Sequence, residues 1–221
     1  MDGPTIQARV YAGYAKAAKV IGIAYDQFRP LSVGAPLGNK VSTVLMALDS
    51  GKTFTFSSPN EYGDPTWLAL INDATVQTGD YLVGNNGGIN TNTYFIAGKQ
   101  FLLPVLAIEC NRSVRVTREN AVTGIGAQPY SGKLPSTETD VLGAPGALWP
   151  ASILAGGRKE AGVNLPAGTK NAGWKMLLPP SVPILIMAGD MVTDDLGRRY
   201  AVDGAELTDL GWRINMNEVH S

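Results

Sequence analysis

The order of hydrophobic and polar positions predicts one helix, at the start of the chain. Apolar side chains recur there at steps of three and four residues, which places them on one face of an α-helix. They are Ile6, Val10, Tyr14, Ala17 and Ile21. Pro4 suits the first turn of this helix and Gly22 suits its end. We therefore expect an N-terminal helical arm over residues 1–28.

The predicted helix also has a basic face. It carries Arg9, Lys16 and Lys19, which on an ordinary surface helix are solvated charges. The alternative is an arm that docks on a partner subunit. In that interpretation the docking residues are Ile6, Arg9, Val10, Tyr14, Lys16 and Lys19.

Beyond residue 28 the pattern changes from helical to strand-like. The run "STVLMALDSGKTFTF" predicts a hairpin that turns at Asp49-Ser50-Gly51. Val114 and Val116 flank Arg115, as in a half-exposed strand. The 26 glycines and 14 prolines favour many turns and short strands over long helices. The chain is therefore predicted to be mainly β.

The β-rich region is predicted to contain an internal repeat. Each block has a tryptophan, then Gly-Asp before an apolar run, then a tyrosine before a further strand. These are Trp67, Gly79-Asp80 and Tyr94 in the first block, and Trp174, Gly189-Asp190 and Tyr200 in the second. After the tyrosines, the residue spacing of the two blocks is predicted to match as far as Ile108 and Ile214. Such self-similarity predicts two similar small β-barrel or sandwich domains, over 29–118 and 144–221, joined by a polar loop or linker at 119–143.

An acidic cluster near the C-terminus is the first candidate for chemistry. Asp190, Asp194, Asp195, Asp203 and Glu206 surround two arginines there, but lack the spacing of an EF-hand calcium loop. The repeat gives a structural interpretation instead. Asp190 is expected to make a local turn hydrogen bond. Residues 194–197 are expected to form a hairpin turn in which the glycine takes positive φ.

Composition and charge narrow the class of protein. The formal net charge of −1 argues against a protein that coats DNA non-specifically. A single cysteine excludes a disulfide within the chain. Neither a secretion-signal pattern nor an apolar run near the ~20 residues of a membrane span occurs. We expect a soluble protein without membrane insertion, made in a reducing cytosol.

The residues needed for common catalytic mechanisms are scarce. The one histidine, His220, is next to the C-terminus, and Cys110 lies in an apolar run typical of a buried strand. The acids Glu109, Glu119, Asp140 and Glu160 are scattered, so a glycosidase pair stays open. The tryptophans are expected to be core anchors, with a sugar-stacking platform as the alternative. We predict a protein that is not an enzyme, without catalytic, cofactor-binding or metal-ligating residues.

Two stretches of the chain resemble proteins of tailed bacteriophages and prophages. "DGPTIQARVYAGYAKAAKVIG" with "TYFIAGKQFLLPVLAIECNR" is similar to proteins encoded among virion structural genes, and "AGDMVTDDLGRRYAVDGAEL" resembles small β-barrels of phage neck and head-completion proteins. The resemblance implies a structural component of a phage tail or head-to-tail junction, with a short-tailed phage as one option. It implies location in the virion tail or neck after synthesis in the host cytoplasm.

For such a component we expect assembly into a sixfold or twelvefold ring of copies, as a tube, nozzle or connector layer through which DNA passes. Free strand edges of small β-domains would be closed by neighbours in the ring. Partners would be the portal, adaptor, nozzle or fibre proteins, with genomic DNA transiently in the lumen. Alternatives are a tail-tip, fibre-attachment or host-glycan binding module, and a tail-associated hydrolase.

Overall fold

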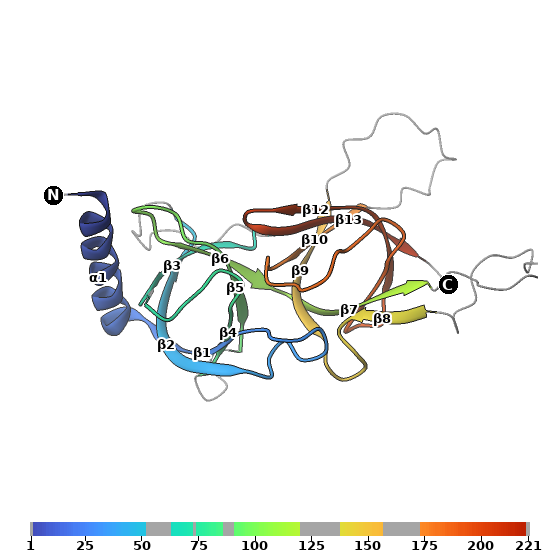
Figure 1. The fold of residues 1–221 in the computed structure, drawn as a ribbon, viewed down its shortest axis with the longest axis horizontal. Coiled ribbons are helices and arrows are strands. Elements are labelled where there is room, and N and C mark those ends of the chain that lie inside the picture. Colours follow the sequence, from blue (N-terminus) through green and yellow to red (C-terminus); the bar gives the residue numbers. More distant parts are fainter. Residues whose placement is uncertain are drawn as a thin grey trace, which may run out of the picture.

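A computed structural model describes residues 2–51, 63–72, 74–85, 91–119, 138–156 and 173–219. The chain is mainly β, with one helix followed by two closed six-stranded barrels, as predicted. The helix, the first barrel and the second barrel follow one another along the longest axis of the molecule (Figure 1).

The first barrel closes in the strand order β1-β2-β3-β6-β5-β4, with every pair antiparallel. Alternate residues of its strands point inward, as the period of two requires, and Tyr25, Met46, Ile71, Leu82 and Ile96 form its centre. The strands are β1 (Ile23–Phe28), β2 (Lys40–Asp49), β3 (Thr66–Ile71), β4 (Tyr81–Gly84), β5 (Thr93–Gly98) and β6 (Val105–Cys110).

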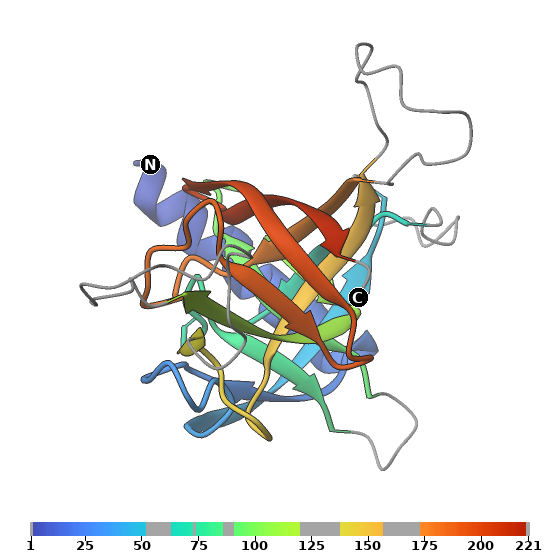
Figure 2. The same ribbon diagram turned by 90° about the vertical axis from the view of Figure 1, so that its right-hand side faces the viewer.

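The second barrel repeats this order as β7-β9-β10-β13-β12-β11 and is closed by the pairing of β11 with β7 (Figure 2). Both the strand order and the antiparallel pairing match the first barrel, which supports the predicted repeat. The strands are β7 (Arg112–Glu119), β8 (Glu138–Leu142), β9 (Trp149–Gly156), β10 (Gly173–Leu178), β11 (Met191–Asp194), β12 (Arg199–Thr208) and β13 (Gly211–Val219).

The predicted domain boundaries need correction on the second barrel. Strand β7 was assigned to the first domain, 29–118, but it pairs with β8, β9 and β11 of the second sheet. Only Asn111 separates β6 from β7, so the chain passes between the barrels without a linker. Within the predicted loop 119–143, residues 138–142 form β8, and residues 120–137 lie outside the described part of the chain.

Strand β8 corresponds to the first half of β2. The pairs Phe28↔Lys40 and Thr117↔Asp140 sit beside matching bulges in the two barrels. In the second barrel the strand is then interrupted by a turn, bridged by Ala144 and Ala147, before β9 begins. One strand of the first barrel is thus split into two in the second, because a turn is inserted.

The N-terminal helix α1 (Gly3–Ile21) begins at Asp2, whose carboxylate accepts a hydrogen bond from the Thr5 amide, and ends at Gly22 as predicted. A Cβ on Gly22 would lie within 3.0 Å of the Met46 carbonyl carbon, so the exit from the helix needs glycine. The predicted arm, 1–28, is corrected at its end, because residues 23–28 are strand β1 of the barrel.

Helix α1 packs against β2 and β3 of its own chain. The buried residues are Tyr11 and Ala18, so the packed side of the helix is rotated away from the predicted apolar face. Small Ala18 allows close approach, and the Tyr11 hydroxyl donates to the Gln100 carbonyl at 2.8 Å. The helix is docked on the first barrel, not a free arm.

The hydrophobic core of the second barrel extends into the first barrel. One cluster contains Tyr81 and Phe95 of the first barrel together with Trp149, Met176 and other residues of the second, while the centre of the first barrel forms a cluster of its own. The Tyr81 hydroxyl donates to the Pro150 carbonyl at 2.8 Å, and the Trp149 indole N–H donates to the Val33 carbonyl at 2.7 Å. Because apolar packing and a buried hydrogen bond both cross the boundary, the barrels hold a defined relative position.

Candidate assembly surface

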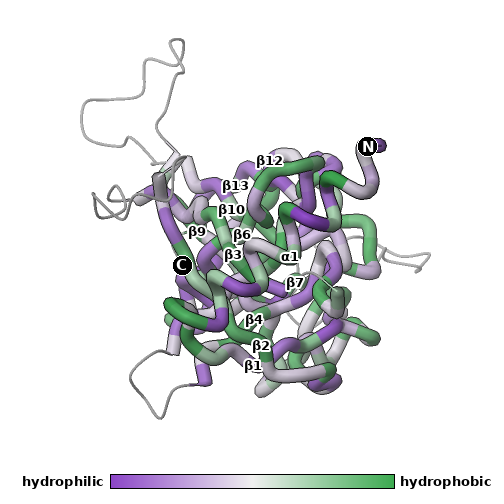
Figure 3. Tube along the Cα trace, turned by 90° about the vertical axis from the view of Figure 1, so that its left-hand side faces the viewer, coloured by the Kyte–Doolittle hydropathy of each residue, from purple (hydrophilic) through white to green (hydrophobic). Residues whose placement is uncertain are grey.

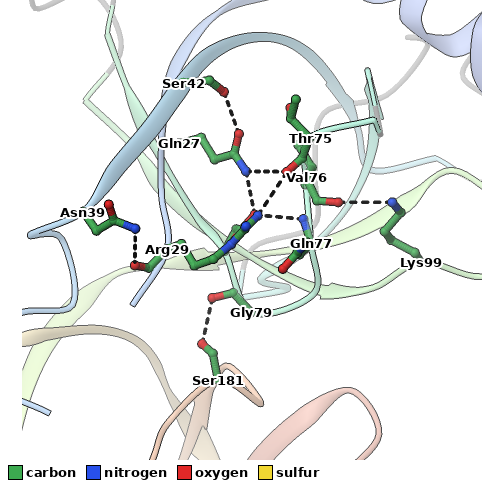
Figure 4. Close-up of polar contacts among 11 residues, drawn as sticks. Gln27, Arg29, Asn39, Ser42, Thr75, Val76, Gln77, Gly79, Lys99 and Ser181 are labelled. Atoms are coloured by element: carbon green, nitrogen blue, oxygen red, sulfur yellow. Dashed lines mark hydrogen bonds and ion pairs between the residues drawn. The ribbon is translucent and has the colours of Figure 1, made fainter. Parts of the chain in front are cut away.

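Both Gly-Asp motifs form the same buried corner. In the first barrel, Asp80 accepts two hydrogen bonds from Arg29, at 2.8 and 2.9 Å, and one from the Gln77 amide at 2.8 Å. Arg29 also donates to the Thr75 carbonyl at 3.1 Å. Figure 4 shows Gln27 of β1, and Arg29 just after β1, converging with residues 75–77. This bidentate contact raises the pKa of the Arg29 guanidinium.

The second barrel repeats the arginine and turn contacts of this corner, while the contacts of Gln27 with Asp80 and Thr75 occur in the first barrel alone among the described residues. Asp190 accepts from Arg118 at 2.7 and 2.9 Å and from the Met187 amide at 2.8 Å, and Arg118 donates to the Leu185 carbonyl. The predicted local turn bond of Asp190 is therefore confirmed. Its ion-pair partner was missed, because Arg118 lies 72 residues earlier in the sequence. Both glycines before these aspartates have φ of +91°.

The C-terminal acidic turn is also structural. Gly197 has φ of +79°, as predicted, and its amide donates to the Asp194 carbonyl. The buried Asp194 carboxylate accepts from the Leu196 and Arg198 amides and from the Tyr200 hydroxyl. Burial and the nearby Asp194 charge raise the pKa of Tyr200 to about 12. Within the described ranges no group of three or more His, Cys, Asp or Glu side chains could hold a metal ion.

The remaining catalytic candidates occupy separate places. Burial raises the pKa of the Cys110 thiol far above its usual value, which disfavours the thiolate that a nucleophile needs. Glu109 accepts from the Trp67 indole and from Asn92, while Asp140 pairs with Arg115. His220 and Glu160 lie outside the described residues. None of the described helical segments combines the length and the apolar character needed to cross a bilayer.

The positions of the four tryptophans favour the expected role as core residues over the alternative of a sugar-stacking platform. Trp149 and Trp212 are buried. Trp67 and Trp174 occupy matching ladder positions and pack edge-on against Tyr94 and Tyr200, respectively.

The six predicted docking residues all lie on α1, but not on one free face. Figure 3 looks onto this end of the molecule, with α1 in front of the first barrel. The exposed ones are Ile6, Arg9, Lys16 and Lys19, and Val10 is half-buried. Tyr14 instead donates to the Leu102 carbonyl at 3.3 Å within the chain. Val20, which is not among the six predicted docking residues, is 83% exposed on α1.

A turn between β5 and β6 presents two large apolar side chains to solvent. Phe101 is 56% exposed and Leu103 is 50% exposed. Between them Leu102 has φ of +60°, the one described non-glycine residue with positive φ. The Leu103 amide closes the turn on the Gln100 carbonyl. Hydroxyls of Tyr11 and Tyr14 hold the turn against α1.

An apolar groove of about 510 Å³ runs between the barrels. The first barrel contributes β5 and β6 side chains and the second contributes β10 and the β12–β13 turn. The apolar lining residues are Phe95, Ala97, Leu106, Ile108, Leu177, Leu178, Leu210 and Trp212, with Thr66, Thr208, Asp209 and Arg213 at the polar positions. Buried Trp212 has an indole N–H without a hydrogen-bond partner among the described residues.

The groove lies where the repeat is broken. Gly98 pairs with Leu106 in the first barrel, whereas the matching Gly204 pairs with Asn215, so the β12–β13 connection is three residues longer. This corrects the predicted match of Ile108 with Ile214, because the strand pairing makes Ile108 equivalent to Asn217. The longer hairpin brings Leu210 against Gly98, where a Cβ would be 2.9 Å away.

Comparison with family models, with curated proteins and with solved structures found no match.

Proposed function

We propose that the chain is a structural subunit of a phage tail or head-to-tail junction. In this proposal it forms an oligomeric ring, as a tube, nozzle or connector layer, through which DNA passes during ejection. The phage assignment derives from the sequence resemblance. The observation that carries an assembly role is the set of exposed apolar side chains on the β5–β6 and β12–β13 turns, together with the inter-barrel groove.

These exposed side chains favour a chain that works with a partner. Large apolar groups on the surface of soluble proteins mark interaction sites where they gather beside an apolar groove. Phe101, Leu103, Leu207 and Leu210 are all exposed. The elements that display them are anchored to a core shared by both barrels, so a partner would meet a surface that is already ordered.

The barrels alter the expected mode of assembly. Closing a sheet removes its edges, so side-chain surfaces, and not unpaired barrel strands, are the main route to contact between copies. Within the described residues β8 has β7 as its one strand partner. Charged side chains on β8 disfavour pairing with a further strand, since Glu138 and Asp140 form ion pairs with Arg199 and Arg115.

The charge distribution suits a DNA passage that does not hold DNA. Six arginines of the described residues face carboxylates in ion pairs: Arg29, Arg115, Arg118, Arg198, Arg199 and Arg213. Paired arginines have less charge left for phosphate groups, whose attraction to cations governs non-specific DNA binding. The host-glycan alternative is less well supported, because the large hydrophobic residues that are exposed in the described ranges include no tryptophan or tyrosine.

The test is the assembly state of the full chain. Mass photometry and negative-stain imaging of the purified protein over a wide concentration range should show closed rings with one dominant mass. A protein that stays monomeric at every concentration, and is monomeric in isolated virions, would contradict the proposal.

A further inference from the structure

The β5–β6 turn is a pre-formed apolar knob. Leu102 occupies the left-handed region, which costs a residue with a side chain roughly 1–2 kcal/mol. Two tyrosine hydroxyls of α1 offset that cost by binding the Gln100 and Leu102 carbonyls. The result is a turn that keeps Phe101 and Leu103 in solvent. Backbone strain of this kind gathers at functional positions.

The inter-barrel groove is a matching receptor. Its apolar lining comes from both barrels and includes Trp212, whose buried indole N–H has no hydrogen-bond partner among the described residues. A buried donor without an acceptor is costly. A chain segment with apolar side chains would cover the apolar lining. Its backbone carbonyl would accept a hydrogen bond from the Trp212 indole after a small movement of that buried ring.

The charges beside the knob and the groove are opposite. Helix α1, which holds the knob, carries Arg9, Lys16 and Lys19 and no acid after its cap. At the groove, Asp209 makes no hydrogen bond or ion pair with the described residues, while Arg213 is paired with Glu206. A partner bearing the knob would therefore bring positive charge to an acidic residue, which favours correct encounter.

The knob cannot fill the groove of its own chain in this arrangement. The two tyrosine bonds keep the turn on α1, and Phe101 lies against Gly3, where a Cβ would be 3.3 Å from its ring. The occupant must come from elsewhere, and a second copy supplies the apolar and basic character that the groove requires.

We infer that neighbouring copies of this chain join by seating the β5–β6 turn of one copy in the inter-barrel groove of the next. Phe101 and Leu103 are the apolar anchors, and Asp209 faces the basic residues of the neighbour's α1. The inference rests on the proposed self-assembling role. Because a stable interface buries about 800 Å² on each partner, adjoining parts of α1, including Ile6, belong to the contact.

The first test is cysteine cross-linking in a Cys110→Ala background, so that the introduced thiols are the only ones. Leu103→Cys and Asp209→Cys proteins are mixed and mildly oxidised. We expect a disulfide-linked dimer in the mixture at several times the yield of either protein alone. The matched control pairs Leu103→Cys with Leu196→Cys, which is equally exposed on a different turn of the second barrel. Equal yields in the two mixtures would overturn the contact.

The second test separates the contact from the proposed function. Phe101→Ser/Leu103→Ser and the control Leu196→Ser are compared with wild type by sedimentation velocity, after circular dichroism and thermal melting show that each is folded. We expect at least a tenfold weaker association for the double variant and no change for the control. If wild type forms oligomers and the double variant forms them equally well, the knob-in-groove contact is wrong and self-assembly stands. If wild type is monomeric in solution and in virions, both fail.

Discussion

Asp26 and Arg115 occupy equivalent positions in the two barrels but carry opposite charges. Each lies three residues before the arginine of the buried corner. Asp26 pairs with Lys40 at 2.7 Å and Arg115 pairs with Asp140 at 3.4 Å. Lys40 and Asp140 are themselves equivalent, because each belongs to the residue pair next to the matching bulge. The repeat therefore preserves a cross-strand ion pair at this site while reversing its direction.

This reversal shows which parts of the repeat are under structural constraint. An exposed cross-strand pair stabilises by roughly the same small amount in either direction. The buried corners have no such freedom, since each aspartate caps a turn and can serve only as an acceptor. The corners kept Arg and Asp in the same places, whereas the outer surfaces of the barrels diverged.

The first prediction concerns the duplicated corner. Replacing Arg118 by methionine leaves the Asp190 carboxylate, 2% exposed, without its ion-pair partner. We expect a loss of about 2–3 kcal/mol in the free energy of unfolding, below the range for a fully buried pair because Arg118 is 33% exposed. Arg29→Met should cost a similar amount in the first barrel. Urea denaturation measures both.

The control for the corner is Arg213→Met. Arg213 and Glu206 are both more than half exposed, and surface pairs of this kind contribute about 0–1 kcal/mol. If Arg118→Met is no more damaging than Arg213→Met, the corner does not have the structural role assigned to it.

The sequence predicted the repeat because its markers are local. Gly-Asp before an apolar run and Tyr after a turn each occupy a few consecutive residues, and the order survived in both blocks. The arginine partners stayed hidden, since Arg29 and Arg118 precede their aspartates by 51 and 72 residues. Barrel closure brings them together, and no local pattern encodes that distance.

The surface was less predictable than the fold. Helical periodicity identified Ile6, Val10 and Ile21 as an apolar face, but packing selected Tyr11 and Ala18, whose hydroxyl and small size suit the barrel surface. The inter-barrel groove depends on a three-residue difference between two hairpins. Matching the blocks by residue type concealed that difference, because isoleucines happened to align at 108 and 214.

The second prediction tests how the barrels are joined. Tyr81→Phe removes the buried hydroxyl that donates to the Pro150 carbonyl, and should cost about 1–2 kcal/mol because a buried acceptor loses its donor. Since the core of the second barrel extends into the first barrel, wild type should unfold in a single transition by calorimetry and by fluorescence. Two separated transitions in wild type would show that the barrels are energetically independent.

The third prediction is a loss of stability in acid at β8. Burial alone would raise the pKa of Glu138. The Thr117 hydroxyl and the Arg199 guanidinium lower this pKa by more than burial raises it, so the net shift is downward. A lowered folded pKa stabilises the fold above the unfolded value, about 4.3, and that contribution is lost as pH falls through the folded pKa. Urea midpoints measured from pH 7 to pH 3 should fall less steeply for Glu138→Gln than for wild type. Parallel pH profiles would contradict the assignment.

The fourth prediction concerns Cys110. Because burial raises its thiol pKa, the folded protein should react with iodoacetamide at pH 8 at least tenfold more slowly than the urea-unfolded chain. Mass spectrometry of the alkylated fraction over time measures this. Equal rates would mean that the β6 thiol is reached by solvent in the native state.

The last prediction is the strain at Leu102. Glycine adopts positive φ without the cost that a side chain incurs there, although it loses more freedom on folding. The two effects nearly cancel, so Leu102→Gly should leave stability unchanged or raise it by up to about 1 kcal/mol. Leu102→Val should instead cost about 1–2 kcal/mol, since β-branched side chains tolerate this region worst. Urea denaturation of both variants, measured on the same day as wild type, distinguishes them. If glycine destabilises as much as valine, the turn is not strained, and the knob owes its position to packing of the Leu102 side chain instead.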